Sequence, residues 1–172
     1  MPTLLVALDA DGTIWSHKDI SSCQPPFRKL AEDTLVDSKG NVVRLYPGVR
    51  ELLRRLKSAG ILIALVTWNR PEPVMEALRK LEILEYFDYI KAEPHPRKHE
   101  MILSLLEEAG LEVSPDHIVY VDDRDIHLKD ILGRVGQVDF VYMWRDVKSH
   151  GELLAYILRR ASALCGHPRL SR

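Results

Sequence analysis

Short apolar runs alternate along the chain with segments of helical periodicity. Residues 4–8 and 61–66 are unbroken apolar runs, which are typical of strands buried on both faces of a parallel sheet. Further strands are expected at 117–121 and 138–143, with a shorter one at 86–90. Between the strands, apolar residues at helical spacing predict helices over 49–59, 71–84, 97–109, 125–132 and 149–165.

This order of elements predicts a doubly wound, Rossmann-like α/β fold, in which helices cover both faces of a parallel sheet. A chain of 172 residues fits a single domain, expected over residues 1–165, with a loose tail over 166–172. Residues 16–47 lack helical periodicity but hold turn residues and a strand-like segment at 42–45, which predicts a flap with a small hairpin. The flap is too short to be a large cap domain.

Composition narrows the class of protein. The formal net charge is −1, so no basic face is indicated and nucleic acid is not an expected partner. The first apolar run is too short to span a bilayer and no basic leader precedes it, so no membrane contact is expected. The two cysteines form no metal or redox motif, which favours a cytoplasmic protein. The scarcity of Asn and Gln favours a thermophilic source. The oligomeric state is left open.

Polar residues directly follow three of the predicted strands. Asp9 and Asp11 come after the first strand and precede a Gly-Thr turn, Thr67 follows the second, and Asp122 and Asp123 follow the fourth. The carboxyl ends of parallel strands lie at one edge of a sheet, where ligands bind, so these groups are expected to meet in one crevice. A solvated Asp-Gly turn is the simpler alternative for the first motif, but it does not explain the recurrence.

These groups suit phosphoryl transfer, which needs a nucleophile, a proton donor for the leaving group and cations near the phosphoryl oxygens. Asp9 can attack phosphorus and form an aspartyl-phosphate, and Asp11 can protonate the leaving oxygen and later activate water. Asp123, with Asp122 beside it, can complete an oxygen-rich site for Mg²⁺. Which of these two carboxylates binds the metal directly is left open.

The same chemistry requires groups that bind the phosphate. The hydroxyl of Thr67 and the backbone N–H groups that follow it, at Trp68 and Asn69, can hold phosphate oxygens. A lysine is also needed to stabilise the phosphorylated aspartate. Lys91 and Lys98 are both candidates for that role.

The four motifs, in this order, resemble the haloacid dehalogenase superfamily of phosphohydrolases. Within it the chain is similar to the magnesium-dependent phosphatase family, which is capless and acid-phosphatase-like. The similarity extends to about Trp144 and is carried by residues 8–15, 25–27, 43–47, 97–100 and 121–124.

The resemblance implies a role for each matching residue. Asp9 is implied as the nucleophile, and Asp11 as the general acid and base whose backbone carbonyl also reaches Mg²⁺. Lys98 matches the family lysine, because it opens the predicted helix. Asp123 matches the direct metal ligand, and Asp122 matches a supporting partner. The metal site implied is therefore Asp9, Asp11 and Asp123.

The choice of substrate is less defined. Compared with the pattern of the family it resembles, the chain has Gly12 where an aromatic residue is often found, and Thr67-Trp68-Asn69 in place of a smaller Ser/Arg-type sequence. Trp15, Phe27 and Trp68 can either line an apolar substrate wall or pack the flap against the core. All of these residues are predicted to lie beside the substrate or the flap.

We therefore expect a Mg²⁺-dependent phosphomonoesterase acting on phosphotyrosine in a protein partner or on small, sugar-type phosphates. The sequence Asp122-Asp123-Arg124 leaves a polynucleotide 3′-phosphatase as an alternative, although a basic groove is missing. A signalling receiver or binding scaffold phosphorylated on aspartate is a different class. Receivers carry the acidic pair after the first strand and the phosphoacceptor after a middle strand, the reverse of the order here.

Overall fold

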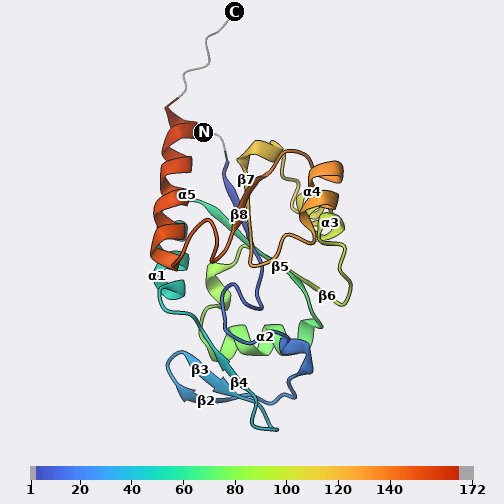
Figure 1. The fold of residues 1–172 in the computed structure, drawn as a ribbon, viewed down its shortest axis with the longest axis vertical. Coiled ribbons are helices and arrows are strands. Elements are labelled where there is room, and N and C mark those ends of the chain that lie inside the picture. Colours follow the sequence, from blue (N-terminus) through green and yellow to red (C-terminus); the bar gives the residue numbers. More distant parts are fainter. Residues whose placement is uncertain (1–2, 167–172) are drawn as a thin grey trace, which may run out of the picture.

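The computed structural model describes residues 3–166. Its centre is a parallel sheet of β1 (Leu5–Leu8), β5 (Leu62–Trp68), β6 (Tyr89–Glu93), β7 (Ile118–Asp122) and β8 (Asp139–Tyr142). The strands lie in the order β6-β5-β1-β7-β8, so the strand nearest the N-terminus is in the middle (Figure 1). Every residue of β1 and β7 is buried.

Helices cover both faces of this sheet, which confirms the predicted doubly wound α/β class (Figure 1). Val6 and Leu8 point to one face and Leu5 and Ala7 to the other, because alternate side chains of a strand point in opposite directions. The first face packs on α1 (Val49–Ser58), α2 (Pro71–Lys80) and α5 (His150–Cys165), and the second on α3 (Lys98–Glu108) and α4 (Leu128–Arg134).

The flap, residues 16–47, is larger than the predicted hairpin. It holds a short 3₁₀ helix, Ile20–Ser22, and an antiparallel sheet of β2 (Arg28–Ala31), β3 (Thr34–Val36) and β4 (Val42–Arg44). Leu35 and Val43 are fully buried and join the flap to the main core, whereas every residue of β2 is exposed. No large cap domain is present among residues 3–166.

Several element boundaries differ from the prediction, among them the start of α4, which is at Leu128 rather than at residue 125. The strand expected at 86–90 begins at Tyr89 and continues to Glu93, while Leu84–Tyr86 is a 3₁₀ helix. The apolar residues of that turn pack against the core, and β6 is an edge strand of half-buried residues, so it carries no apolar run. The preceding helix ends at Lys80, where Glu82 adopts a left-handed conformation with φ 59°.

The register of the sheet aligns the ends of its three central strands. Leu8 of β1 lies beside Leu65 of β5 and Val121 of β7, so the residues that follow these strands emerge at one edge. The flap lies at this same end of the sheet (Figure 1). No helix within residues 3–166 is both long and apolar enough to cross a membrane. The predicted loose tail lies, beyond Gly166, outside the described residues.

Candidate active site

The carboxyl edge of the sheet brings the sequence-predicted acids together. The backbone N–H of Asp9 donates to the carbonyl of Val121, 2.9 Å away, which continues the β1–β7 pairing to the start of the motif. Carboxylate oxygens of Asp9, Asp122 and Asp123 all lie within 4.8 Å of one another. Asp9 and the pair Asp122-Asp123, more than 110 positions apart in the sequence, therefore form one acidic group because β1 and β7 are neighbours in the sheet.

A buried lysine joins two of these acids. The Nζ of Lys98 donates to Asp9 Oδ1 at 2.6 Å and to Asp122 Oδ2 at 2.8 Å, and its side chain is 2% exposed. Lys98 is the first residue of α3, so the start of this helix places its ammonium group beside the acids at the carboxyl edge of the sheet. Lys91 instead donates to Ser104 and Glu108, away from the acids. The structure thus places one of the two candidate lysines at the site.

Burial and charge together set the pKa values of this group. Burial raises the pKa of Asp9, and the nearby ammonium of Lys98 opposes that rise. Burial also acts to raise the pKa of Asp122, but Lys98 and the hydrogen bonds from Tyr120 and the Arg124 backbone lower it overall. Although burial acts to lower the pKa of Lys98, the charges of Asp9 and Asp122 raise it, so the lysine stays protonated. The pKa directions favour a charged pair of Lys98 and Asp122, whereas the pKa of Asp9 is raised by its burial.

The donors around the acids indicate which of them can hold a metal. Asp122 accepts from Lys98 and the Tyr120 hydroxyl through one oxygen, and from the Arg124 N–H at 3.0 Å through the other. Asp123 accepts a long hydrogen bond of 3.4 Å from Thr13 Oγ1. Asp9 accepts from Lys98 and Thr13, one donor on each oxygen. Asp123, which these donors engage least, is therefore better placed than Asp122 to ligate a hard divalent cation, and the acidic group as a whole fits Mg²⁺.

Gly12 is required by the geometry of this acidic group. Its φ is +71°, a left-handed conformation that favours glycine, and a Cβ at this position would overlap the carboxylate of Asp123. An aromatic residue here would displace Asp123 from its position beside Asp9. Glycine at this position therefore leaves room for the Asp123 carboxylate beside Asp9.

Asp11 connects the sheet edge to the flap. Its carboxylate accepts from Trp15 Nε1 at 2.7 Å, from Asn69 Nδ2 at 2.9 Å and from the backbone N–H of Ile20 at 3.3 Å. Burial raises the pKa of Asp11, and the hydrogen bonds from Trp15 and Asn69 oppose the rise. A raised pKa favours the protonated form, which is the form a proton donor needs.

The segment after β5 holds Asn69 at the centre of a hydrogen-bond network. Its Nδ2 also donates to Thr67 Oγ1 at 2.8 Å, and its Oδ1 accepts from Ser21 Oγ at 2.6 Å. Thr67 and Asn69 are both buried, while Trp68 between them is 44% exposed. The structure therefore assigns the amide of Asn69 to holding Asp11 and the flap in place.

The three aromatic residues left open by the sequence divide between core and cavity. Trp15 and Phe27 are buried in the main core, at 0% and 2% exposure. Trp68 lines the cavity beside the acids. Of these three residues, Trp68 alone lines the cavity.

A cluster of rings from the C-terminal part of the chain holds the loop that carries the acids. Trp144 Nε1 donates to the carbonyl of Gly12 at 2.8 Å, and His150 Nε2 donates to the carbonyl of Thr13 at 2.7 Å. The ring of Tyr46 packs against both aromatic side chains, with centroids 4.7 Å and 5.7 Å away. Sequence reasoning missed this cluster, because nothing in the spacing of residues 46, 144 and 150 predicts their contact.

The acids open onto a cavity of about 780 Å³. Its lining includes the acids Asp9, Asp11 and Asp123, the side chains of Thr67 and Lys98, and several residues of the flap. This volume lies in the range of small-molecule binding sites. The site can therefore hold a whole organic phosphate rather than the phosphoryl group alone.

The fold and this site define a hydrolase of a known family. Residues 6–133 match the model of the family described as haloacid dehalogenase-like hydrolase. The match spans well over half of the chain, so the protein belongs to that family.

Individual relatives agree with this membership. The chain is 31% identical over 129 residues to Magnesium-dependent phosphatase 1 of Homo sapiens, covering 74% of this chain and 71% of the human protein. It is 36% identical over 104 residues to the Phosphorylated carbohydrates phosphatase of Thermotoga maritima, covering 56% of this chain and 46% of that protein. The named relatives support assignment as a phosphatase.

A solved structure shares the fold. The N-terminal part of the protein BF1531 from Bacteroides fragilis, which contains a phosphatase domain and is complexed with Mg, superimposes with a TM-score of 0.61 at 19% identity. The superposition covers 91% of this chain and 39% of that one. At this identity the likeness shows the fold alone. The chain spans less than half the length of the T. maritima protein and of this solved chain.

Proposed function

We propose that this protein is a Mg²⁺-dependent phosphomonoesterase that works through an aspartyl-phosphate. The observation that carries the proposal is the buried carboxylate of Asp9, held by Lys98 at 2.6 Å and by Thr13 Oγ1 at 3.0 Å, at the inner end of an open cavity. A carboxylate fixed by two donors beside a substrate-sized cavity is suited to nucleophilic attack. The Mg-complexed structural relative and the name of the human relative support the metal.

In the first step the Asp9 carboxylate forms a bond to phosphorus while the bond from phosphorus to the leaving oxygen breaks. Asp11 gives its proton to that oxygen, so an alcohol or phenol leaves in neutral form. Lys98 keeps its positive charge beside Asp9 and offsets the negative charge that develops on the phosphoryl group. The hydroxyl of Thr67, buried at the end of β5, would bind a phosphate oxygen. The predicted contribution of the Asn69 backbone is not part of this proposal, because its N–H donates to the carbonyls of Thr67 and Glu93.

In the second step Asp11 takes a proton from water, and the resulting nucleophile attacks phosphorus. The bond between phosphorus and Asp9 breaks, inorganic phosphate leaves and the carboxylate of Asp9 is restored. Magnesium held by Asp9, the Asp11 backbone carbonyl and Asp123 would supply the remaining positive charge at the phosphoryl oxygens. Asp122 would hold Lys98 and the loop of Asp123 rather than the metal.

For the substrate, we propose small, sugar-type phosphates, with phosphotyrosine in a protein as the second candidate. The T. maritima relative supports the first, and the cavity of about 780 Å³ has room for it. The exposed indole of Trp68 supports the second, because it can pack against a phenol ring.

The proposal is tested by p-nitrophenyl phosphate hydrolysis with and without Mg²⁺, for the wild type and Asp9→Asn. We expect turnover only with Mg²⁺ and a loss of more than about 10³-fold in the variant, because asparagine cannot form the phosphoenzyme. Asp130→Asn, which makes the same change at an exposed residue of α4, is the matched control and should keep the wild-type activity. Substantial activity in folded Asp9→Asn would contradict the mechanism.

A further inference from the structure

The outer part of the cavity differs in charge from its inner part. The inner lining consists of the buried or half-buried residues Asp9, Asp11, Lys98 and Asp123. The outer lining carries exposed cations at Lys18, Arg70 and Arg124, with one exposed acid, Asp19. Within residues 3–166, none of the three outer cations forms an ion pair with a carboxylate. We call this outer lining the mouth of the cavity. Its positive charge is therefore not neutralised by ion pairs within the described residues.

One of these cations is already held in position. Arg70 donates from Nη2 to the carbonyl of Ser21 at 2.7 Å, and its backbone N–H donates to Ser21 Oγ at 2.9 Å. Ser21 is in turn fixed by Asn69, the residue that holds Asp11. A guanidinium held in this way loses less freedom when it binds a carboxylate or a phosphate, for which its planar donors are suited.

Two indoles stand in the wall of the same cavity. Trp68 and Trp144 are 44% and 36% exposed and both line it. Trp144 adopts a left-handed conformation with φ 72°, which is strained for a bulky residue. Two hydrogen bonds hold Trp144 in this conformation. Its indole N–H donates to the carbonyl of Gly12, and its own carbonyl accepts from Lys148 Nζ at 2.9 Å. Backbone strain of this kind is concentrated at functional sites.

We propose that the mouth of the cavity is a binding site for a second anionic group of the substrate. The preferred substrate is then a small phosphomonoester whose leaving group ends in a carboxylate or a second phosphate. Its phosphoryl group lies at Asp9, its body passes the two indoles, and its far anion meets Arg70, Arg124 and Lys18. This inference rests on the proposed function, because it concerns the leaving group of the same reaction.

The test compares two aryl phosphates of similar size whose far ends are charged in one and neutral in the other. They are 4-(carboxymethyl)phenyl phosphate and 4-(2-hydroxyethyl)phenyl phosphate, in which a methylene group separates the end group from the ring. We expect the wild type to favour the carboxylate by about tenfold or more in kcat/KM, the contribution of a charge-assisted hydrogen bond. Arg70→Gln and Arg124→Gln should each lower this ratio several-fold.

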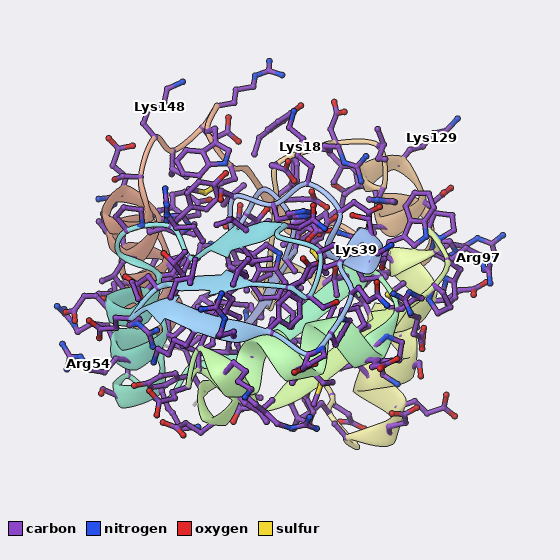
Figure 2. The ribbon with its side chains drawn as sticks, turned by 90° about the horizontal axis from the view of Figure 1, so that it is seen from below. Lys18, Lys39, Arg54, Arg97, Lys129 and Lys148 are labelled. Carbon is purple, nitrogen blue, oxygen red and sulfur yellow. The ribbon has the colours of Figure 1, made fainter. Side chains whose placement is uncertain are left out.

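Lys129→Gln is the matched control, because Lys129 projects from α4 into solvent and does not line the cavity (Figure 2). It should keep the wild-type ratio. A wild-type ratio near one would overturn the inference while leaving the phosphatase intact. Equal losses on both substrates in the arginine variants would also overturn it, since the cations would then only attract the scissile phosphate. If the wild type hydrolysed neither compound nor p-nitrophenyl phosphate, the proposed function would fail, and the second site with it.

Discussion

The carboxyl edge of the central sheet and the flap border the same cavity but are held by different forces. At the edge, Asp9 and Lys98 are buried and form charged contacts of 2.6 Å at the end of fully buried strands. In the flap, β2 is exposed along its whole length, and the β3–β4 turn depends on hydrogen bonds to Asp37. The edge therefore holds the proposed reacting groups in buried contacts. The flap buries fewer of its residues. Substitutions in it should therefore affect the choice and affinity of substrate more than the rate of the chemical step.

The largest effect should come from Lys98→Met, which removes the cation from the sheet edge. Asp9 and Asp122 would then face each other without it, and removing one partner of a buried ion pair typically costs about 3–5 kcal/mol. We expect a loss of roughly that size in the free energy of urea unfolding, and a fall in kcat of at least about 100-fold.

Lys91→Met is the control for this prediction. Lys91 pairs with Glu108, whose side chain is 66% exposed, so its loss should cost less than about 1 kcal/mol. If both lysine variants behaved alike, the buried network would not be what distinguishes the sheet edge.

A smaller effect is expected from Asn69→Ala, which cuts the connection between the two regions. The variant frees Asp11 from one donor and Ser21 from its acceptor. We expect kcat to fall about tenfold, because the proton donor is less well positioned, and stability to fall by about 1–3 kcal/mol. Asn41→Ala, which removes an amide from the flap turn alone, should lower stability without a comparable fall in kcat. Equal kcat values for the two variants would contradict a linking role for Asn69.

Trp68 is the last residue of β5, but its side chain is exposed in the cavity. Trp68→Ala tests whether this side chain contacts the substrate. For aryl phosphates we expect KM to rise about two- to tenfold with little change in kcat, the range of one aromatic contact. Trp68→Phe should recover most of the affinity, since it keeps a ring at the wall. A fall in kcat with unchanged KM would instead assign Trp68 to the reacting geometry.

The smallest effect on activity should come from Asp37→Asn in the flap turn. Burial acts to raise the pKa of Asp37, but hydrogen bonds from Asn41, Gln24 and Lys39 lower it from 3.8 to about 2. Because the folded pKa lies below the unfolded one, the carboxylate stabilises the fold above about pH 4, and this stabilisation is lost as the pH falls toward 2.

Urea unfolding at two pH values checks this sign. At pH 6 the variant should be less stable than the wild type by about 1–2 kcal/mol, and the difference should shrink at pH 3. Glu112→Gln, at an exposed carboxylate, should show no such pH-dependent difference. A deficit that stayed constant with pH would assign the effect to lost packing rather than to charge. Activity at pH 7 should change little, in contrast to the variants of the sheet edge.

The local sequence was sufficient for the elements whose residues are buried on both faces. Apolar runs such as 4–8 and 61–66 predict such strands, and β1 and β5 lie where they were expected. The edge strand β6 was displaced in the prediction, because a half-buried edge strand needs no apolar run and the nearby Leu84 and Tyr86 pack as a turn. The flap was underestimated for a similar reason, since the exposed residues of β2 follow no hydrophobic pattern.

The sequence by itself determined the fold class and the set of polar residues at the strand ends, because strand pairing in a parallel sheet brings such ends to one edge. The residues alone left Lys91 and Lys98 both open, and the family resemblance favoured Lys98; the tertiary structure places Lys98 beside Asp9 and directs Lys91 to Glu108. It also decided that Trp15 belongs to the core and Trp68 to the cavity, and that Trp144 and His150 hold the loop of the acids. These contacts join residues more than 80 positions apart through side-chain packing, which no local periodicity encodes.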